Sequence, residues 1–125
     1  MNENPKILIV DDFETVRLFL RNALNQIGIE NIEEAADGRE ALQMISAAKK
    51  SGEQFDLIFC DWNMPEMTGI ELLQALNAKD VKIPFGFVTS EGTPEMRTRA
   101  ADAGAKFLVA KPFSAEDLQA AINGA

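Results

Sequence analysis

The segment Ile7–Asp12, which reads Ile-Leu-Ile-Val-Asp-Asp, decides the fold of this chain. Its first four residues form a short, uniformly apolar run, which is typical of a β-strand that is buried on both faces. Two adjacent carboxylates follow at the point where this strand should end. Ligands of open α/β sheets bind beyond the carboxyl ends of the strands, so the segment predicts a buried strand and, at its end, part of a polar site.

Outward from this segment, strand and helix signals alternate along the chain. Apolar runs predict further strands at residues 55–60, 84–88 and 106–110, and a weaker strand signal lies at residues 31–35. Apolar residues at helical spacing predict helices over about 16–27, 41–50, 70–77, 94–103 and 115–122. Repeated βα units with short connections favour an α/β fold, a parallel sheet that is covered by helices on both faces.

The composition of the chain excludes several classes of function and partner. The chain has 125 residues, which fits one domain, and its 46% of hydrophobic residues provide for a core. The 12 Lys and Arg against 20 Asp and Glu give a net charge of −8, which argues against nucleic acid or an anionic membrane as partner. The start of the chain does not fit a signal peptide, and no apolar stretch is long enough to span a membrane, so we expect a cytoplasmic protein.

Two residue counts exclude further classes. The chain contains no His, which excludes Ser-His-Asp hydrolases, Cys-His proteases and most catalytic zinc sites. For the same reason the chain cannot carry a phosphoryl group on histidine. Cys60 is the only Cys, so no disulfide can form within the chain.

Polar residues follow the other expected strands as well. Asp61 comes after the third strand, Thr89 after the fourth and Lys111 after the fifth, and all three should meet Asp11 and Asp12 at one edge of the sheet. Three neighbouring carboxylates repel one another, and a single Lys cannot balance them. A divalent cation can do so, and an all-oxygen ligand set that leaves room for waters favours Mg²⁺ over Ca²⁺.

Such a site suits phosphoryl transfer. A cation on one wall, with Lys111 and Thr89 on the other, would neutralise the equatorial oxygens of a phosphoryl group in the transition state. Asp61 is the favoured nucleophile, which would become an aspartyl phosphate. It lies on the middle strand of the site, and the loop that follows, residues 62–65, can lend a backbone carbonyl to the metal. We expect Trp62 in this loop to be partly exposed.

In their order and spacing, these motifs resemble the receiver domains of two-component response regulators, most closely the single-domain, CheY-like members. The motifs are Ile7–Asp12, Asp61–Pro65, Val88–Glu91 and Lys111–Phe113, and the resemblance covers essentially the whole chain. It implies a flavodoxin-like (βα)5 fold, a doubly wound parallel sheet of strand order 2-1-3-4-5. It also implies a single receiver domain over residues 1–125 with no output domain.

The resemblance assigns roles to the residues of the predicted site. Asp61 would be the phosphoacceptor. Mg²⁺ would be bound directly by Asp12, Asp61 and the main-chain carbonyl of Asn63, and mainly through a water by Asp11. Thr89 would close on the phosphoryl group.

Lys111 would pair with that phosphoryl group by the same resemblance. The donor would be a phosphohistidine of a partner histidine kinase, since a chain without His cannot be the donor itself. The output would be protein binding by a monomer, to a flagellar motor component or another signalling protein, in a pathway such as chemotaxis. The chain would not be an enzyme beyond catalysing its own phosphorylation and autodephosphorylation.

One departure from the family pattern keeps other functions open. Family members usually carry Tyr or Phe three residues before the conserved Lys, where this chain has Leu108, and the adjacent Phe107 should point to the opposite face of its strand. A phosphate sink or phosphorelay intermediate without direct output is therefore an alternative. A second is a Mg²⁺-dependent small phosphohydrolase, although Asn63 stands where such an enzyme needs another carboxylate. A non-phosphorylated interaction module is a third.

Overall fold

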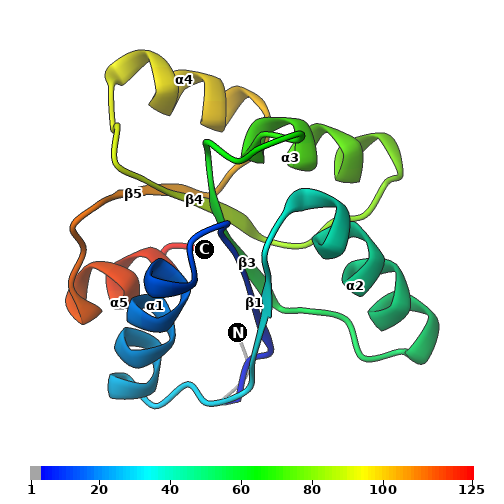
Figure 1. Ribbon diagram of the computed structural model, residues 1–125, viewed down its shortest axis with the longest axis horizontal. Coiled ribbons are helices and arrows are strands. Elements are labelled where there is room, and N and C mark those ends of the chain that lie inside the picture. Colours follow the sequence, from blue (N-terminus) through cyan, green and yellow to red (C-terminus); the bar gives the residue numbers. More distant parts are fainter. Residues whose placement is uncertain (1–3) are drawn as a thin grey trace.

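A computed structural model describes residues 4–125 of the protein, in which strands and helices alternate (Figure 1). The elements are β1 Ile7–Val10, α1 Glu14–Gln26, β2 Ile32–Ala35, α2 Gly38–Ser51, β3 Leu57–Asp61, α3 Gly69–Ala78, β4 Phe85–Thr89, α4 Pro94–Asp102, β5 Phe107–Ala110 and α5 Ala115–Asn123. No helix in this part of the chain is long and apolar enough to cross a membrane.

All the strands belong to one parallel sheet of order β2-β1-β3-β4-β5, which confirms the predicted flavodoxin-like fold. Two strand ends differ from the sequence prediction. β3 runs one residue further, to Asp61, and β4 runs one residue further, to Thr89. The reason is backbone pairing, because Asp61 lies opposite Val88 and Thr89 lies opposite Ala110, so the ladder continues past the last apolar side chain. Two site residues are therefore held by the sheet itself.

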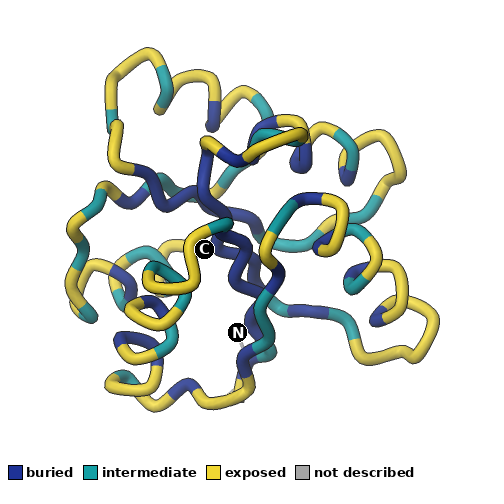
Figure 2. The backbone as a smooth tube through the Cα atoms, viewed as in Figure 1, coloured by how far each residue is buried: buried dark blue, intermediate teal, exposed yellow. Residues whose placement is uncertain are grey.

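The sheet separates two hydrophobic cores, one on each face. α1 and α5 cover one face, and α2, α3 and α4 cover the other (Figure 1). Successive residues of β1 serve the two cores in turn, because Ile7 and Ile9 pack toward α1 and α5 while Leu8 and Val10 pack toward α2 and α3. The central strands β1, β3 and β4 are accordingly the most deeply buried part of the molecule, and the edge strands β2 and β5 are less buried (Figure 2). This double burial is why β1 reads as an unbroken apolar run, whereas the edge strand β2 carries Glu33 and Glu34.

A side-chain N-cap begins α2. The sequence Asp37-Gly38 is a turn signal, but in the structure Asp37 is the N-cap of the helix, and its Oδ1 accepts a hydrogen bond from the backbone N–H of Glu40 at 2.8 Å. An N-cap carboxylate satisfies one of the backbone donors that the first helical turn leaves unpaired. The connection from β2 to α2 is therefore shorter and tighter than a separate turn would be.

Gly86 of β4 allows a close approach between two strands. It lies opposite Phe107 of β5, and a Cβ atom added to it would stand 2.0–2.3 Å from carbons of the Phe107 ring. The ring occupies this space on the α1–α5 face, with its centroid 5.2 Å from that of Phe59. Leu108, the next residue, packs against the core on the other face, as the alternation along a strand predicts.

We predict that Gly86→Ala lowers the free energy of unfolding by about 1–3 kcal/mol, because the new methyl group overlaps the Phe107 ring. Denaturant unfolding measures the change, and Gly124→Ala, whose added Cβ would find nothing closer than 3.6 Å, serves as control. In a Phe107→Ala background the same Gly86→Ala change should cost little. An equal cost in both backgrounds would show that the ring is not responsible.

Candidate functional site

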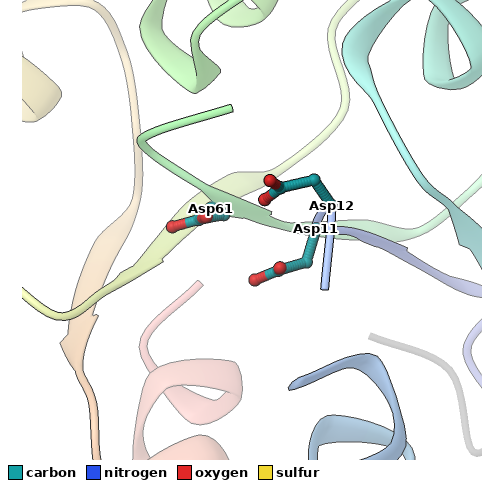
Figure 3. A group of neighbouring side chains, drawn as sticks. All are labelled: Asp11, Asp12 and Asp61. Atoms are coloured by element: carbon teal, nitrogen blue, oxygen red, sulfur yellow. The ribbon is translucent and has the colours of Figure 1, made fainter. Parts of the chain in front are cut away.

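Three carboxylates meet at the carboxyl ends of the two central strands. Asp11 and Asp12 follow β1, Asp61 ends β3, and β1 and β3 are hydrogen-bonded neighbours. One carboxylate oxygen from each residue lies within 4.8 Å of the others. Figure 3 shows the three side chains reaching from the two strand ends into the same space. Asp11 and Asp61 are only 1% and 6% exposed, so this is a largely desolvated acidic cluster.

Lys111 brings one positive charge to the cluster. It follows β5, and its Nζ lies 3.2 Å from Oδ2 of Asp11 and 3.4 Å from Oδ1 of Asp61. Its backbone N–H donates to the carbonyl oxygen of Thr89 at 2.7 Å, and the Lys111–Pro112 peptide is cis. Because β4 separates β5 from β3 in the sheet, the lysine side chain reaches across the end of β4 to contact both aspartates.

One ammonium does not neutralise this cluster. Burial, followed by repulsion from Asp11, raises the pKa of Asp61 to about 6, although Lys111 acts in the opposite direction. Asp11 gains a further partner, since its Oδ1 accepts a hydrogen bond from the backbone N–H of Phe13 at 2.8 Å. The site therefore retains excess negative charge in a buried position.

Asp12 supplies an independent sign of an ion site. Its Oδ1 is buried and accepts no hydrogen bond from any residue of the described part of the chain. A buried carboxylate oxygen without a partner is costly, and a cation can compensate for it. The donor set is all oxygen, which matches a hard divalent cation such as Mg²⁺. The residues present therefore fit the metal that the sequence predicts.

Thr89 lies at the same edge of the sheet as the cluster, and in the described part of the chain its hydroxyl forms no hydrogen bond with the three aspartates. Its side chain is fully buried at the end of β4, one residue past the partner of Asp61 in the sheet. The Thr89 Oγ1 accepts a hydrogen bond from the backbone N–H of Glu91 at 3.2 Å, which ties the hydroxyl to the loop that follows the strand.

Asn63 is the predicted site residue with the least structural support. It is exposed in the loop after β3, two residues beyond Asp61. Within residues 4–125, no contact given by the structure joins it to the acidic cluster. Its proposed role rests on a main-chain carbonyl, so the exposure of its side chain does not bear on that role.

Trp62 corrects one expectation. The sequence predicts a partly exposed side chain, but the indole is only 6% exposed and packs on Phe87 with ring centroids 4.7 Å apart. The guanidinium of Arg99, from α4, lies 5.4 Å from the indole centroid. Because α4 and its neighbours cover the face of the sheet that Trp62 enters, the loop position does not leave it in water.

Arg17 of α1 is a neighbour of the site that the sequence does not reveal. Its Nη1 donates a hydrogen bond to the main-chain carbonyl oxygen of Asp11 at 2.7 Å. A contact with a backbone carbonyl leaves no pattern of residue types in a sequence. The only available signal is an arginine one turn into the helix that follows the aspartate pair.

Comparisons with known proteins agree with this geometry. The family model described as the response regulator receiver domain matches residues 7–123. The chain is 43% identical over 121 residues to chemotaxis protein CheY-3 of Vibrio cholerae, covering 95% of this chain and 89% of that protein. It is 43% identical over 120 residues to chemotaxis protein CheY of Pseudomonas aeruginosa, covering 94% and 93%. The crystallised V. cholerae chemotaxis protein CheY4 superposes with a TM-score of 0.81 at 35% identity, covering 96% of this chain and 97% of that one.

We predict that Asp61→Asn stabilises the metal-free protein. The change removes a buried charge that Asp11 repels, while Lys111 keeps Asp11 as its partner. A pKa raised to about 6 corresponds to a gain in the free energy of unfolding of about 1–3 kcal/mol at neutral pH. Denaturant unfolding in EDTA measures it, with the exposed Asp102→Asn as control. A loss of stability in Asp61→Asn would contradict the repulsion.

Proposed function

Because the chain belongs to the response regulator receiver domain family, we propose that it is a phosphorylation-dependent switch of two-component signalling that accepts a phosphoryl group on Asp61. The observation that carries the proposal is the cluster of Asp11, Asp12 and Asp61, in which the ammonium of Lys111 contacts Asp11 and Asp61. The relatives named for chemotaxis support a role in that process. The proposal places the protein in the cytoplasm, as a monomer.

In the proposed reaction, a carboxylate oxygen of Asp61 attacks the phosphorus of a phosphohistidine on a partner kinase. The new P–O bond forms as the P–N bond breaks, and the imidazole leaves with the electron pair of that bond. Lys111 then pairs with the phosphoryl oxygens in place of the free carboxylate. Mg²⁺ held by Asp11, Asp12, Asp61 and the Asn63 carbonyl would neutralise charge on those oxygens when bound.

The product is an acyl phosphate, and the same site would also remove it. Water attacks the phosphorus, the P–O bond to Asp61 breaks, and inorganic phosphate and the free carboxylate result. Both steps form or break a bond to the chain's own Asp61, so the proposal assigns no enzyme activity beyond these two steps.

The hydroxyl of Thr89 can connect this chemistry to the surface. The hydroxyl can donate to a phosphoryl oxygen while its Oγ1 still accepts from the N–H of Glu91, so a movement of Thr89 toward the phosphoryl group would pull the loop after β4 with it. Arg97 of α4 bridges this loop to β5, because its guanidinium donates to the carbonyl oxygens of Gly92 at 3.3 Å and Leu108 at 3.2 Å. A change at Thr89 would therefore reach α4 and β5, where a downstream protein could bind.

A second candidate function, a phosphate sink or relay intermediate without direct output, is favoured by one observation. The aromatic residue of β5, Phe107, is packed over Gly86 on the α1–α5 face, and the opposite face carries Leu108 instead. On the face that α4 covers, β5 therefore has no aromatic side chain whose rotation could report phosphorylation. Output through α4 and β5 would have to rely on the loop and Arg97 alone.

We predict that acetyl phosphate and Mg²⁺ add a single phosphoryl group to the protein, measured as a mass increase of the intact chain. Asp61→Asn should abolish the increase, and EDTA should suppress it in the unchanged protein. Asp102→Asn, which alters an exposed carboxylate on α4, should be labelled normally. Labelling that persists in Asp61→Asn would refute the assignment of the phosphoacceptor.

The switch and the sink make opposite predictions about partners. We predict that immobilised protein treated with Mg²⁺ and beryllofluoride, an analogue of the phosphoryl group, retains a downstream protein that untreated protein does not retain. Quantitative mass spectrometry of the bound fraction measures the difference, and Asp61→Asn treated in the same way is the control. Identical bound fractions with and without beryllofluoride would favour the sink.

A further inference from the structure

A charged cluster outside the acidic site joins α1 to the edge of the sheet. Glu34 of β2 accepts a hydrogen bond on Oε1 from Nε of Arg17 at 2.9 Å and on Oε2 from Nε of Arg21 at 2.8 Å. Partial burial works against ionisation, yet the hydrogen bonds and charges of Arg21 and Arg17 hold the pKa of Glu34 below its ordinary value. The carboxylate is thus a fixed anchor for two guanidinium groups one helical turn apart.

The two arginines use their remaining nitrogens differently. Arg17 donates from Nη1 to the main-chain carbonyl oxygen of Asp11 at 2.7 Å, at the edge of the acidic site. Arg21 donates from Nη2 to the carbonyl oxygen of Ile32 at 3.2 Å, at the opposite end of β2. Both therefore bind Glu34 and one backbone carbonyl, but only Arg17 reaches the site. Arg21 is therefore a matched control for Arg17.

The carbonyl that Arg17 holds belongs to the peptide bond between Asp11 and Asp12. A peptide bond is planar, so fixing this carbonyl also fixes the N–H of Asp12 and the plane from which the Asp12 backbone continues. Asp11 is already fixed elsewhere, since its N–H donates to the Ala35 carbonyl and its Oδ1 accepts from Phe13. Arg17 adds the restraint that bears on Asp12, whose buried Oδ1 has no partner in the described part of the chain.

Repulsion among the carboxylates makes this restraint necessary. Asp12 is attached by a short side chain beside two buried aspartates, and Lys111 contacts those two aspartates. A freely turning Asp11–Asp12 peptide could relieve the repulsion by swinging the Asp12 carboxylate toward water. The guanidinium of Arg17 donates to Glu34 and to the Asp11 carbonyl at the same time, and its donors are fixed in one plane. It therefore resists this movement of the peptide.

We propose that Arg17, braced by Glu34, is a positioning residue that holds the Asp11–Asp12 peptide so that Asp12 faces the cation. The inference rests on the proposed function in naming that cation as Mg²⁺. The holding of the peptide is a property of the protein without any ion.

Arg17→Lys and Arg21→Lys form the test pair. Each keeps the positive charge but removes the guanidinium that donates to Glu34 and to a backbone carbonyl at the same time. In metal-free protein, the amide NMR signals of Asp12 and Phe13 should shift in Arg17→Lys and stay near their original positions in Arg21→Lys. In Mg²⁺ titrations followed by the fluorescence of Trp62, which adjoins Asp61, the Kd should rise about 10-fold in Arg17→Lys and much less in Arg21→Lys. Glu34→Gln should resemble a weaker form of Arg17→Lys.

Denaturant unfolding in EDTA separates positioning from general stability. Both lysine variants should lose similar, small amounts of stability, since both lose one contact with Glu34 and one with a carbonyl. Equal amide shifts at Asp12 in the two variants would overturn the positioning role, whatever the Mg²⁺ affinity. An unchanged protein that binds no Mg²⁺ would overturn the metal part of the proposed function, while the metal-free shifts would still decide the role of Arg17.

Discussion

Repulsion among three carboxylates is the constraint on which the rest of this structure depends. Asp11, Asp12 and Asp61 can stay together only because the two central strands, each buried on both faces, hold the backbone to which they are attached. The hydrophobic cores above and below the sheet therefore oppose an electrostatic force at its edge. Lys111 relieves part of that force from the far side of β4. The fold as a whole maintains a concentration of charge that its own residues do not balance.

This imbalance is also what gives the site its chemistry. A fully compensated cluster would have little affinity left for a cation. Among residues 4–125 the buried Oδ1 of Asp12 has no hydrogen-bond partner, so compensation within this part of the chain is incomplete. Uncompensated charge at such a site lowers the free energy of unfolding, and a bound cation would raise it again. Functional sites commonly show this loss of stability in the absence of their ligand. The supporting contacts do not neutralise the cluster either, since Arg17 binds the carbonyl of the Asp11–Asp12 peptide and the N–H of Phe13 donates to one oxygen of Asp11.

The sequence was sufficient to predict the order of the elements and the meeting of Asp11, Asp12, Asp61 and Lys111 at the site. Both predictions follow from patterns of neighbouring residues. Apolar runs mark strands, and parallel strands bring their carboxyl ends to one edge. The sequence was insufficient wherever a distant partner decides the outcome. Pairing with β4 and β5 extends two strands through Asp61 and Thr89, and Phe87 buries Trp62. The grip of Arg17 on a carbonyl depends on where a helix lies, which residue types do not encode.

The contact between Lys111 and Asp11 has a consequence for the order in which the molecule becomes competent. The two residues are 100 positions apart, and Lys111 is 50 positions from Asp61. During synthesis the aspartates emerge first, and the chain that carries them lacks its counter-charge until β5 has docked beside β4. A chain whose synthesis has not reached Lys111 therefore carries the three aspartates without the ammonium that contacts two of them. Under the proposed function, reactivity toward a phosphoryl donor would therefore require the finished sheet, and a kinase would phosphorylate only molecules that have completed folding.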